Sequence, residues 1–451
     1  MAWQPHSERD RREMLEALGA ESVDALFADI PAGLRETAMP DLPAPLTEME
    51  LVARAADLAG QNASLDELTC FAGGGIYDHF IPAIVRNVIS RPEFLTPYTP
   101  YQPEASQGTL QAIFEYQTMI CELTGMHSAN ASLYDGATAL GEAVLLAADV
   151  THRKRVVIAG ALSPVARQAA ETYCSAGGIE IALAPWDDAT GQTDLAALAE
   201  MLDDSVACVA LQQPNYFGVL EQMPEAASLA REAGALFTAM VEPTSLVLLK
   251  PPGEYDADLV VGEGQPLGLP PGYGGPLLGI FACREEYLRQ MPGRVVGRTV
   301  DAAGETAYCL TLQTREQHIR RDRATSNICT NQGLCALAAA VYMAAMGPEG
   351  LREVALLGAE RAHQLRDLLN AAGLEPRFGG AFLNEFVLRV PAQADAVVRE
   401  LCAQGYLVGP SLARDFDELG DCLLLATTER RTVAEVEAVV DAMNALELEE
   451  K

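Results

Sequence analysis

Residues 206–241 read VACVALQQPNYFGVLEQMPEAASLAREAGALFTAMV, and this stretch decides the fold. It opens with the apolar run 206–211, turns at a segment with Pro and Gly, and continues as a helical stretch over 222–234. It closes with a second apolar run, 235–241. Apolar runs of this length without polar alternation are typical of strands buried on both faces. A strand, a helix and a second such strand in succession predict a parallel sheet.

The same pattern continues on both sides of this stretch. Further apolar runs of strand length occur at 156–159, 179–183, 259–261 and 277–282, and helical stretches occur at 163–176 and 194–203. An amphipathic helix between Gly108 and Gly125 precedes them. The sequence therefore predicts an α/β fold with a mostly parallel sheet covered by helices.

Both ends of the chain have a different pattern. Ser7 and Gly19 have the positions of caps on a helix through Leu18, and Thr47 begins a second helix that ends at Gly60. After an apolar helix over 333–346, helices near 349–372, 392–404 and 432–447 flank strands near 382–390 and 421–426. We therefore expect an N-terminal helical segment (1–69), a large domain (70–330) and a smaller C-terminal α/β domain (331–451).

Composition excludes several classes of protein. The chain has 451 residues and a net charge of −32, which disfavours nucleic acid and anionic membranes as partners. No segment approaches the ~20 apolar residues of a membrane helix, and the N-terminus lacks the apolar core of a signal peptide. Ten cysteines without a Cys-x-x-Cys pair, and six scattered histidines, predict reduced thiols and no metal site. These features together predict a cytoplasmic protein.

Four segments have the composition of ligand-binding loops, which in such folds follow the carboxyl ends of the strands. The small-residue turn 130–142 enters a helix and either holds a phosphate or is a plain helix start capped by Asp135. The segment 213–219 is a ligand loop or an ordinary turn. Glu242 ends a strand and faces either a ligand or solvent. The Gly/Pro-rich string 264–276 is either a close-contact loop or a rigid surface loop.

The order of these segments is that of the phosphate loop, ring-contact loop, pyridine-nitrogen carboxylate and Schiff-base lysine of fold-type I pyridoxal-phosphate enzymes. Longer strings are more specific. The chain resembles the N-terminal half, or α subunit, of the glycine cleavage system P-protein family over nearly its whole length. The resemblance is carried by the strings FAGGGIYDHFIPAIVRNVISRPEFLTPYTPYQPEASQGTLQ, LTGMHSANASLYDGATALGEA, LKPPGEYDADLVVGEGQPLGLPPGYGGPLLG and LQTREQHIRRDRATSNICTNQ.

This resemblance implies a pyridoxal-phosphate-transferase-like fold with a degenerate cofactor site. The family's Schiff-base lysine falls on Gln265, which cannot form an imine, and its ring-nitrogen aspartate falls on Glu242. The Ser-Gly pair of the phosphate loop falls on Ala137 and Thr138. We therefore expect no catalytic residue and no cofactor on this chain. The chain has only three lysines, and a self-sufficient enzyme would have to use Lys250.

The resemblance further implies a division of labour between subunits. A β subunit would carry the lysine and pyridoxal phosphate in an α2β2 assembly that decarboxylates glycine and transfers the aminomethyl group to the lipoyl arm of H-protein. This chain would wall the shared site and channel, and the candidate residues are Tyr98, Tyr101, Gln102, Glu104, Tyr134 and Asp135. The alternative is that these tyrosines only pack an interface.

Two questions stay open at this point. The basic segment around His318 and Arg320–Arg323 fits a subunit contact, a docking site for an acidic H-protein or a solvated charge run, and we favour the subunit contact. The chain as a whole could also be a non-catalytic scaffold or regulator that keeps the fold of the family.

Overall fold

The computed structural model describes residues 6–35, 42–95, 99–272, 274–324 and 326–446. The chain divides into two compact units, 1–63 and 64–451. The first unit contains the helices α1 (Glu8–Leu18), α2 (Ala32–Arg35) and α3 (Glu48–Ala59), and α1 and α3 bury no residue. Capping boxes at Ser7 and Thr47 and the caps Gly19 and Gly60 lie where the sequence predicts them.

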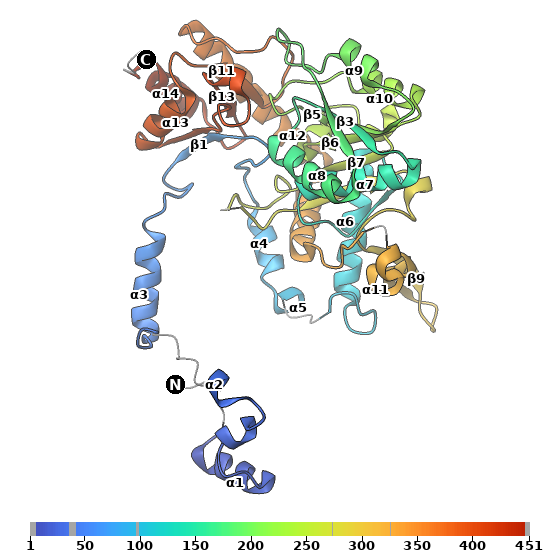
Figure 1. Ribbon diagram of the computed structural model, residues 1–451. Helices are drawn as coiled ribbons and strands as arrows, with labels where there is room; N and C mark the ends of the chain where they lie inside the picture. The colour runs from blue at the N-terminus through green and yellow to red at the C-terminus, as the bar shows by residue number, and fades with distance from the viewer. Residues whose placement is uncertain (1–5, 36–41, 96–98, 273, 325, 447–451) are drawn as a thin grey trace. The chain divides into compact units, whose positions relative to one another are not determined.

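The second unit is built on a seven-stranded sheet with the order β2-β8-β7-β6-β5-β3-β4. Figure 1 labels β3, β5, β6 and β7 of this sheet. The five strands from β7 to β4 are parallel, whereas β8 and β2 are antiparallel to their neighbours. This arrangement confirms the predicted α/β fold with a mostly parallel sheet. The strands are β2 (Ser128–Ala129), β3 (Arg155–Ala159), β4 (Glu180–Ala184), β5 (Val206–Gln213), β6 (Leu236–Val241), β7 (Leu259–Glu263) and β8 (Gly279–Cys283).

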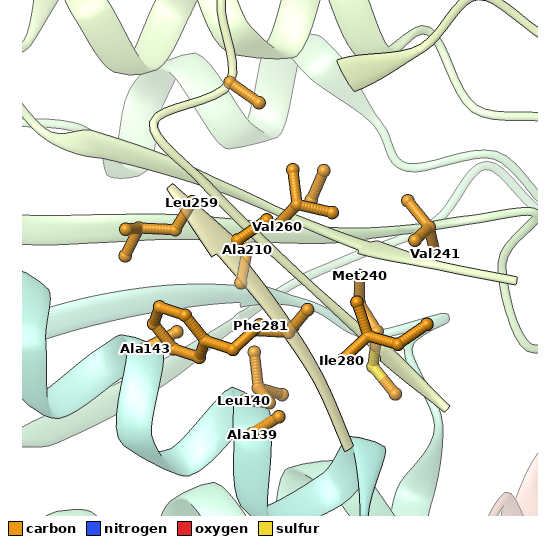
Figure 2. Close-up of a cluster of buried hydrophobic side chains, with 14 of the residues drawn as sticks. Ala139, Leu140, Ala143, Ala210, Met240, Val241, Leu259, Val260, Ile280 and Phe281 are labelled. Carbon is orange, nitrogen blue, oxygen red and sulfur yellow. The ribbon is translucent and has the colours of Figure 1, made fainter. Parts of the chain in front are cut away.

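Helices cover this sheet and bury its apolar strands. Figure 2 shows Leu140 and Ala143 of α7 close to Phe281 of β8, within the largest hydrophobic core. The helices of this large lobe are α4 (Ala83–Ile89), α5 (Pro92–Leu95), α6 (Gln107–Thr124), α7 (Gly136–Thr151), α8 (Pro164–Gly177), α9 (Leu195–Met201), α10 (Met223–Glu232) and α11 (Gln317–Arg320). A hairpin of β9 (Val295–Val300) and β10 (Thr306–Thr311), which the sequence did not predict, precedes α11.

The small lobe has its own core and draws on both ends of the second unit. It consists of β11 (Glu385–Arg389), α13 (Ala394–Ala403), β12 (Tyr406–Gly409), β13 (Cys422–Ala426) and α14 (Val433–Asn444). The strand β1 (Thr69–Ala72) pairs in parallel with β12 and contributes Phe71 to this core. The division predicted at 69/70 therefore falls inside β1, and the structure separates its two units six residues earlier.

One long helix, α12 (Gly333–Ala371), serves both lobes. Its first half lies in the large core and its second half in the small core, with a kink at Gly347 (φ 62°, ψ 179°) before Pro348. Among the described residues, this helix alone has the length and composition of a membrane span, with a mean hydropathy of 1.4 over 18 residues. Half of that stretch is buried within the protein, as in an ordinary core helix.

Candidate functional site

The four predicted ligand loops meet at the carboxyl edge of the parallel strands. The backbone N–H of Glu242, after β6, donates to the carbonyl of Gln213 at the end of β5 (3.2 Å). The N–H of Gly136, at the start of α7, donates to the carboxylate of Glu263 at the end of β7 (2.9 Å). The fold thus brings together the segments that the sequence suggested, and the local contacts show what each one does.

Gln265 is fully buried, and its amide is paired with protein groups. Its Oε1 accepts from the Tyr77 N–H (2.9 Å), and its Nε2 donates to the carbonyls of Tyr77 (3.0 Å) and Leu269 (2.7 Å). This reciprocal pairing resembles one step of a β-ladder, made by a side chain. A buried amide with its donors and acceptor satisfied serves as a structural anchor.

The start of α7 is saturated by carboxylates of the chain itself. Glu263 accepts from the N–H groups of Gly136, Gln265 and Leu278, each at 2.9 Å. Asp135 caps the helix by accepting from the Thr138 N–H (2.7 Å), while Ala137 lies between these two anchored residues. Burial raises the pKa of Glu263 to about 7. The helix start that a phosphate would occupy in this fold already faces two acidic side chains.

Glu242 is held by its own loop. Its carboxylate accepts from the N–H groups of Thr244 (2.9 Å) and Ser245 (2.7 Å) and from the Thr244 hydroxyl (2.7 Å). It therefore acts as the N-cap of the short 3₁₀ helix Pro243–Val247. Glu242 is half-buried, and the contacts described are with its own loop.

The predicted ring-contact loop, 213–219, packs against the small lobe. Asn215 Nδ2 donates to Glu221 (2.8 Å), and the Phe217 ring stacks on Phe378 at 4.8 Å between centroids. A Cβ added at Gly218 would lie 2.0 Å from the carbonyl oxygen of Glu385, so the backbones of the two lobes touch there. This loop thus forms a contact between the lobes.

A second cluster joins two of the predicted channel residues. The Tyr101 hydroxyl donates to the side chain of Asn331, and the guanidinium of Arg294 lies 4.1 Å from the centre of the Tyr101 ring. The Tyr134 hydroxyl pairs with Thr330 (3.2 Å). Burial raises the pKa of Tyr101 to about 12, so this phenol is a hydrogen-bond donor at neutral pH. The segments around 101, 134 and 330 therefore form one polar group.

This cluster borders a cavity of about 270 Å³. Phe94, Ile113, Leu334 and Leu337 supply its apolar wall, and Tyr101 and Asn331 supply polar groups. Gln102 and Glu104 are exposed beside it, and Tyr98 lies outside the described residues.

The remaining observations concern the exposure of the basic segment and the search for metal ligands. Arg320, Arg321 and Arg323 are exposed, and His318 lies 3.4 Å from Glu316. Among the described residues, no group of three or more His, Cys, Asp or Glu side chains is placed to hold a metal ion.

Sequence reasoning missed Tyr77, Glu263 and Glu385. The Tyr77 hydroxyl donates to Glu385 (2.8 Å), and the Gly74 N–H donates to the same carboxylate (2.6 Å). One signal was available, because Gly73-Gly74-Gly75 predicts close backbone approach. A Cβ at Gly73 would lie 2.1 Å from Glu385 Oε1.

Comparison with known proteins gives consistent full-length matches. The family model "Glycine cleavage system P-protein" matches residues 1–443. The chain is 48% identical to the "probable glycine dehydrogenase (decarboxylating) subunit 1" of Moorella thermoacetica, over 99% of this chain and 100% of the relative. The protein of the same name from Desulforamulus reducens is 46% identical over the same shares. This chain belongs to the glycine cleavage system P-protein family.

Solved structures agree with this membership. A crystal structure of glycine decarboxylase (P-protein) of the glycine cleavage system, in inhibitor-bound form, superposes with a TM-score of 0.91 at 44% identity, covering 98% of this chain and 99% of that one. The Burkholderia pseudomallei sphingosine-1-phosphate lyase shares 15% identity with a TM-score of 0.66 over 92% of this chain and 93% of that one. At that identity the likeness shows the fold alone.

The fold of the P-protein family implies pyridoxal phosphate, and the residues of this chain do not fit that group. The resemblance puts the imine position at Gln265, which is buried and fully paired. The resemblance puts the phosphate position at the start of α7, where Glu263 and Asp135 already accept from the N–H groups of Gly136 and Thr138. Both carboxylate oxygens of Glu242 accept hydrogen bonds from residues of its own loop. Three separate contacts are thus satisfied without a cofactor.

Proposed function

We propose that this chain is the α subunit (subunit 1) of glycine dehydrogenase (decarboxylating) and acts together with a lysine-bearing β subunit. Pyridoxal phosphate is carried by that β subunit, in an α2β2 assembly in the cytoplasm. The assembled enzyme decarboxylates glycine and transfers the aminomethyl group to the lipoyl arm of H-protein. The observation that carries this proposal is the buried, hydrogen-bonded Gln265 in a chain that matches subunit 1 relatives from end to end.

Lys250 offers no alternative route in this proposal. It is exposed and lies after the 3₁₀ helix that Glu242 caps, whereas the imine position is fully buried. A pure chain mixed with pyridoxal phosphate should therefore stay colourless. A yellow adduct at Lys250 that borohydride reduces would instead support a self-sufficient enzyme.

The part left to this chain is to shape the partner's site. The cavity beside Tyr101 combines an apolar wall with the fixed polar groups of Tyr101 and Asn331. Tyr134 pairs with Thr330, the residue before Asn331, and the N-cap Asp135 follows Tyr134 in the chain. Tyr98, Gln102 and Glu104 lie close to Tyr101 in sequence. Preorganised polar groups beside an apolar wall suit a channel that guides a small substrate or a flexible arm.

The direct test is glycine–bicarbonate carbon exchange. Three mixtures are compared: this chain with H-protein, the β subunit with H-protein, and all three proteins together. Exchange only in the complete mixture is the expected result. Exchange by the β subunit alone at the full rate would make this chain a scaffold or regulator, and exchange by this chain alone would refute the proposal.

The exposed arginines suit a contact with the partner subunit. Arg320, Arg321 and Arg323 lie on α11 and the turn after it, in a chain whose net charge is −32. Charge reversal at Arg320 and Arg321 should weaken assembly with the β subunit, measured by analytical ultracentrifugation. Unchanged assembly at physiological salt would assign this segment to another role.

A further inference from the structure

Three buried side chains form a continuous connection between the two lobes. Gln265 follows β7 of the large sheet, Tyr77 lies on the loop after β1, and Glu385 begins β11 of the small lobe. The amide of Gln265 holds the backbone of Tyr77 from both sides (2.9 and 3.0 Å), and the Tyr77 hydroxyl donates to Glu385 (2.8 Å). Tyr77 is 5% exposed, so this connection runs through the interior.

The loop that carries Tyr77 lies outside the helices and strands, so β-ladder hydrogen bonds do not fix its backbone. Residues 73–82 form no helix or strand, yet their backbone groups are tied at several points. Gly74 donates to Glu385 (2.6 Å), and the Phe80 N–H donates to Glu429 (2.6 Å). The Thr428 hydroxyl donates to the backbone carbonyl of Asp78 (2.8 Å). Side chains from both lobes thus replace the hydrogen bonds that secondary structure would provide.

Tyr77 also lies within the altered cofactor site. It contacts the imine position directly through Gln265. Burial raises its pKa well above the ordinary value, and the negative charges of Glu385 and Glu242 raise it further. Glu242, which the resemblance puts at the ring-nitrogen position, thus contributes to the electrostatic environment of Tyr77.

We propose that the positions which hold a cofactor in this fold form a permanent joint in this chain, with Tyr77 filling the pocket while Gln265 and Glu385 fix it between the two lobes. This goes beyond the division of labour proposed above, because it gives the altered positions a role of their own. Loss of the lysine is then one part of a rebuilt interior in which Glu263 anchors the start of α7. Restoring the lysine alone should not restore the site.

Hydrogen exchange of the intact wild-type chain tests the joint first. Peptides covering 73–79 should exchange as slowly as those covering β7, although the loop has no secondary structure. In Q265A, exchange should accelerate at least ~10-fold both in 73–79 and at the start of β11. Q212A is the matched control, because Gln212, near the carboxyl end of β5 in the same sheet, also accepts from a backbone N–H (Ser163, 2.9 Å). Fast exchange of 73–79 in the wild type would refute the joint.

A second experiment tests whether the pocket is filled. The Q265K variant is incubated with pyridoxal phosphate, reduced with borohydride and mapped by peptide mass spectrometry. No adduct at position 265 is the expected result, and a near-stoichiometric adduct there would overturn the proposal.

If Q265K does not fold, hydrogen exchange of the Y77F variant tests the joint instead. It keeps the backbone pairing with Gln265 and removes the link to Glu385, so faster exchange at the start of β11 is expected and unchanged exchange there would count against the joint. Neither experiment uses the β subunit, so their failure differs from failure of the exchange assay.

Discussion

Glu385 should make the stability of the protein depend on pH in a measurable way. Glu385 is 5% exposed as a residue, and burial raises the pKa of its carboxyl group to about 7 from the ordinary value of 4.5. Hydrogen bonds from Tyr77 and Gly74 oppose this rise without cancelling it. The difference between the pKa of Glu385 in the folded protein and its ordinary value corresponds to about 3 kcal/mol in the free energy of unfolding.

The direction follows from proton binding. Because the folded pKa lies above the unfolded one, the folded protein binds this proton more tightly than the unfolded chain does. Its contribution to stability is complete below pH 4.5 and is lost as the pH rises through 7. E385Q keeps the shape of the side chain and stays neutral, so it lacks this loss. Relative to the wild type, E385Q should gain about 3 kcal/mol between pH 4.5 and pH 8.

Urea unfolding, followed by far-UV circular dichroism at several pH values, measures this difference. Equal slopes for the two proteins are required before their free energies are compared. E375Q is the control for the loss of one negative charge, because Glu375 is exposed and its backbone carbonyl accepts from Arg389, in the same strand as Glu385. A difference between E385Q and the wild type that stays constant from pH 4.5 to 8 would refute the reasoning.

Three further predictions concern backbone space, helix capping and the channel. G218A should cost about 1–3 kcal/mol more than G405A, because both glycines have positive φ (79° and 92°) but only at Gly218 would a Cβ meet backbone, at 2.0 Å; equal unfolding midpoints would contradict this. T432A should lower the global unfolding free energy by about 1 kcal/mol, whereas T47A, which removes the same capping box from α3, should leave it unchanged because α3 buries no residue; equal losses in the two variants would show that α3 shares the cooperative core. Y101A should reduce glycine–bicarbonate exchange of the assembled enzyme about 10- to 100-fold without dissociating it, since Tyr101 is fixed by Asn331 and Arg294; normal exchange would limit Tyr101 to interface packing.

Local rules predicted the parts of the fold that depend on neighbouring residues. The caps at Ser7, Thr47 and Asp135 are interactions over three residues, and each is present. The apolar runs gave the parallel strands to within a few residues, because burial on both faces leaves the same pattern along each strand. The kink in α12 also lies where Gly347-Pro348 predicted a break.

Long-range partners could not be read in this way. Position 265 was recognisable through the family resemblance, but Tyr77, its partner, lies 188 residues earlier in the chain. The same holds for Glu385, which meets Tyr77 across 308 residues. A local pattern does not indicate such long-range pairings, so the sequence indicated an altered site but not the side chains that contact it.

The pairing of β1 with β12 sets an order of events during synthesis. β1 leaves the ribosome about 340 residues before the strand that completes it. At ~5–20 residues per second, this strand waits for roughly 20–70 s. Throughout that interval Cys70 and Phe71, which are buried in the finished protein, stay accessible to other chains and to chaperones. The small lobe therefore cannot be completed before β12 has been made, although β1 is the first strand of the chain to be synthesised.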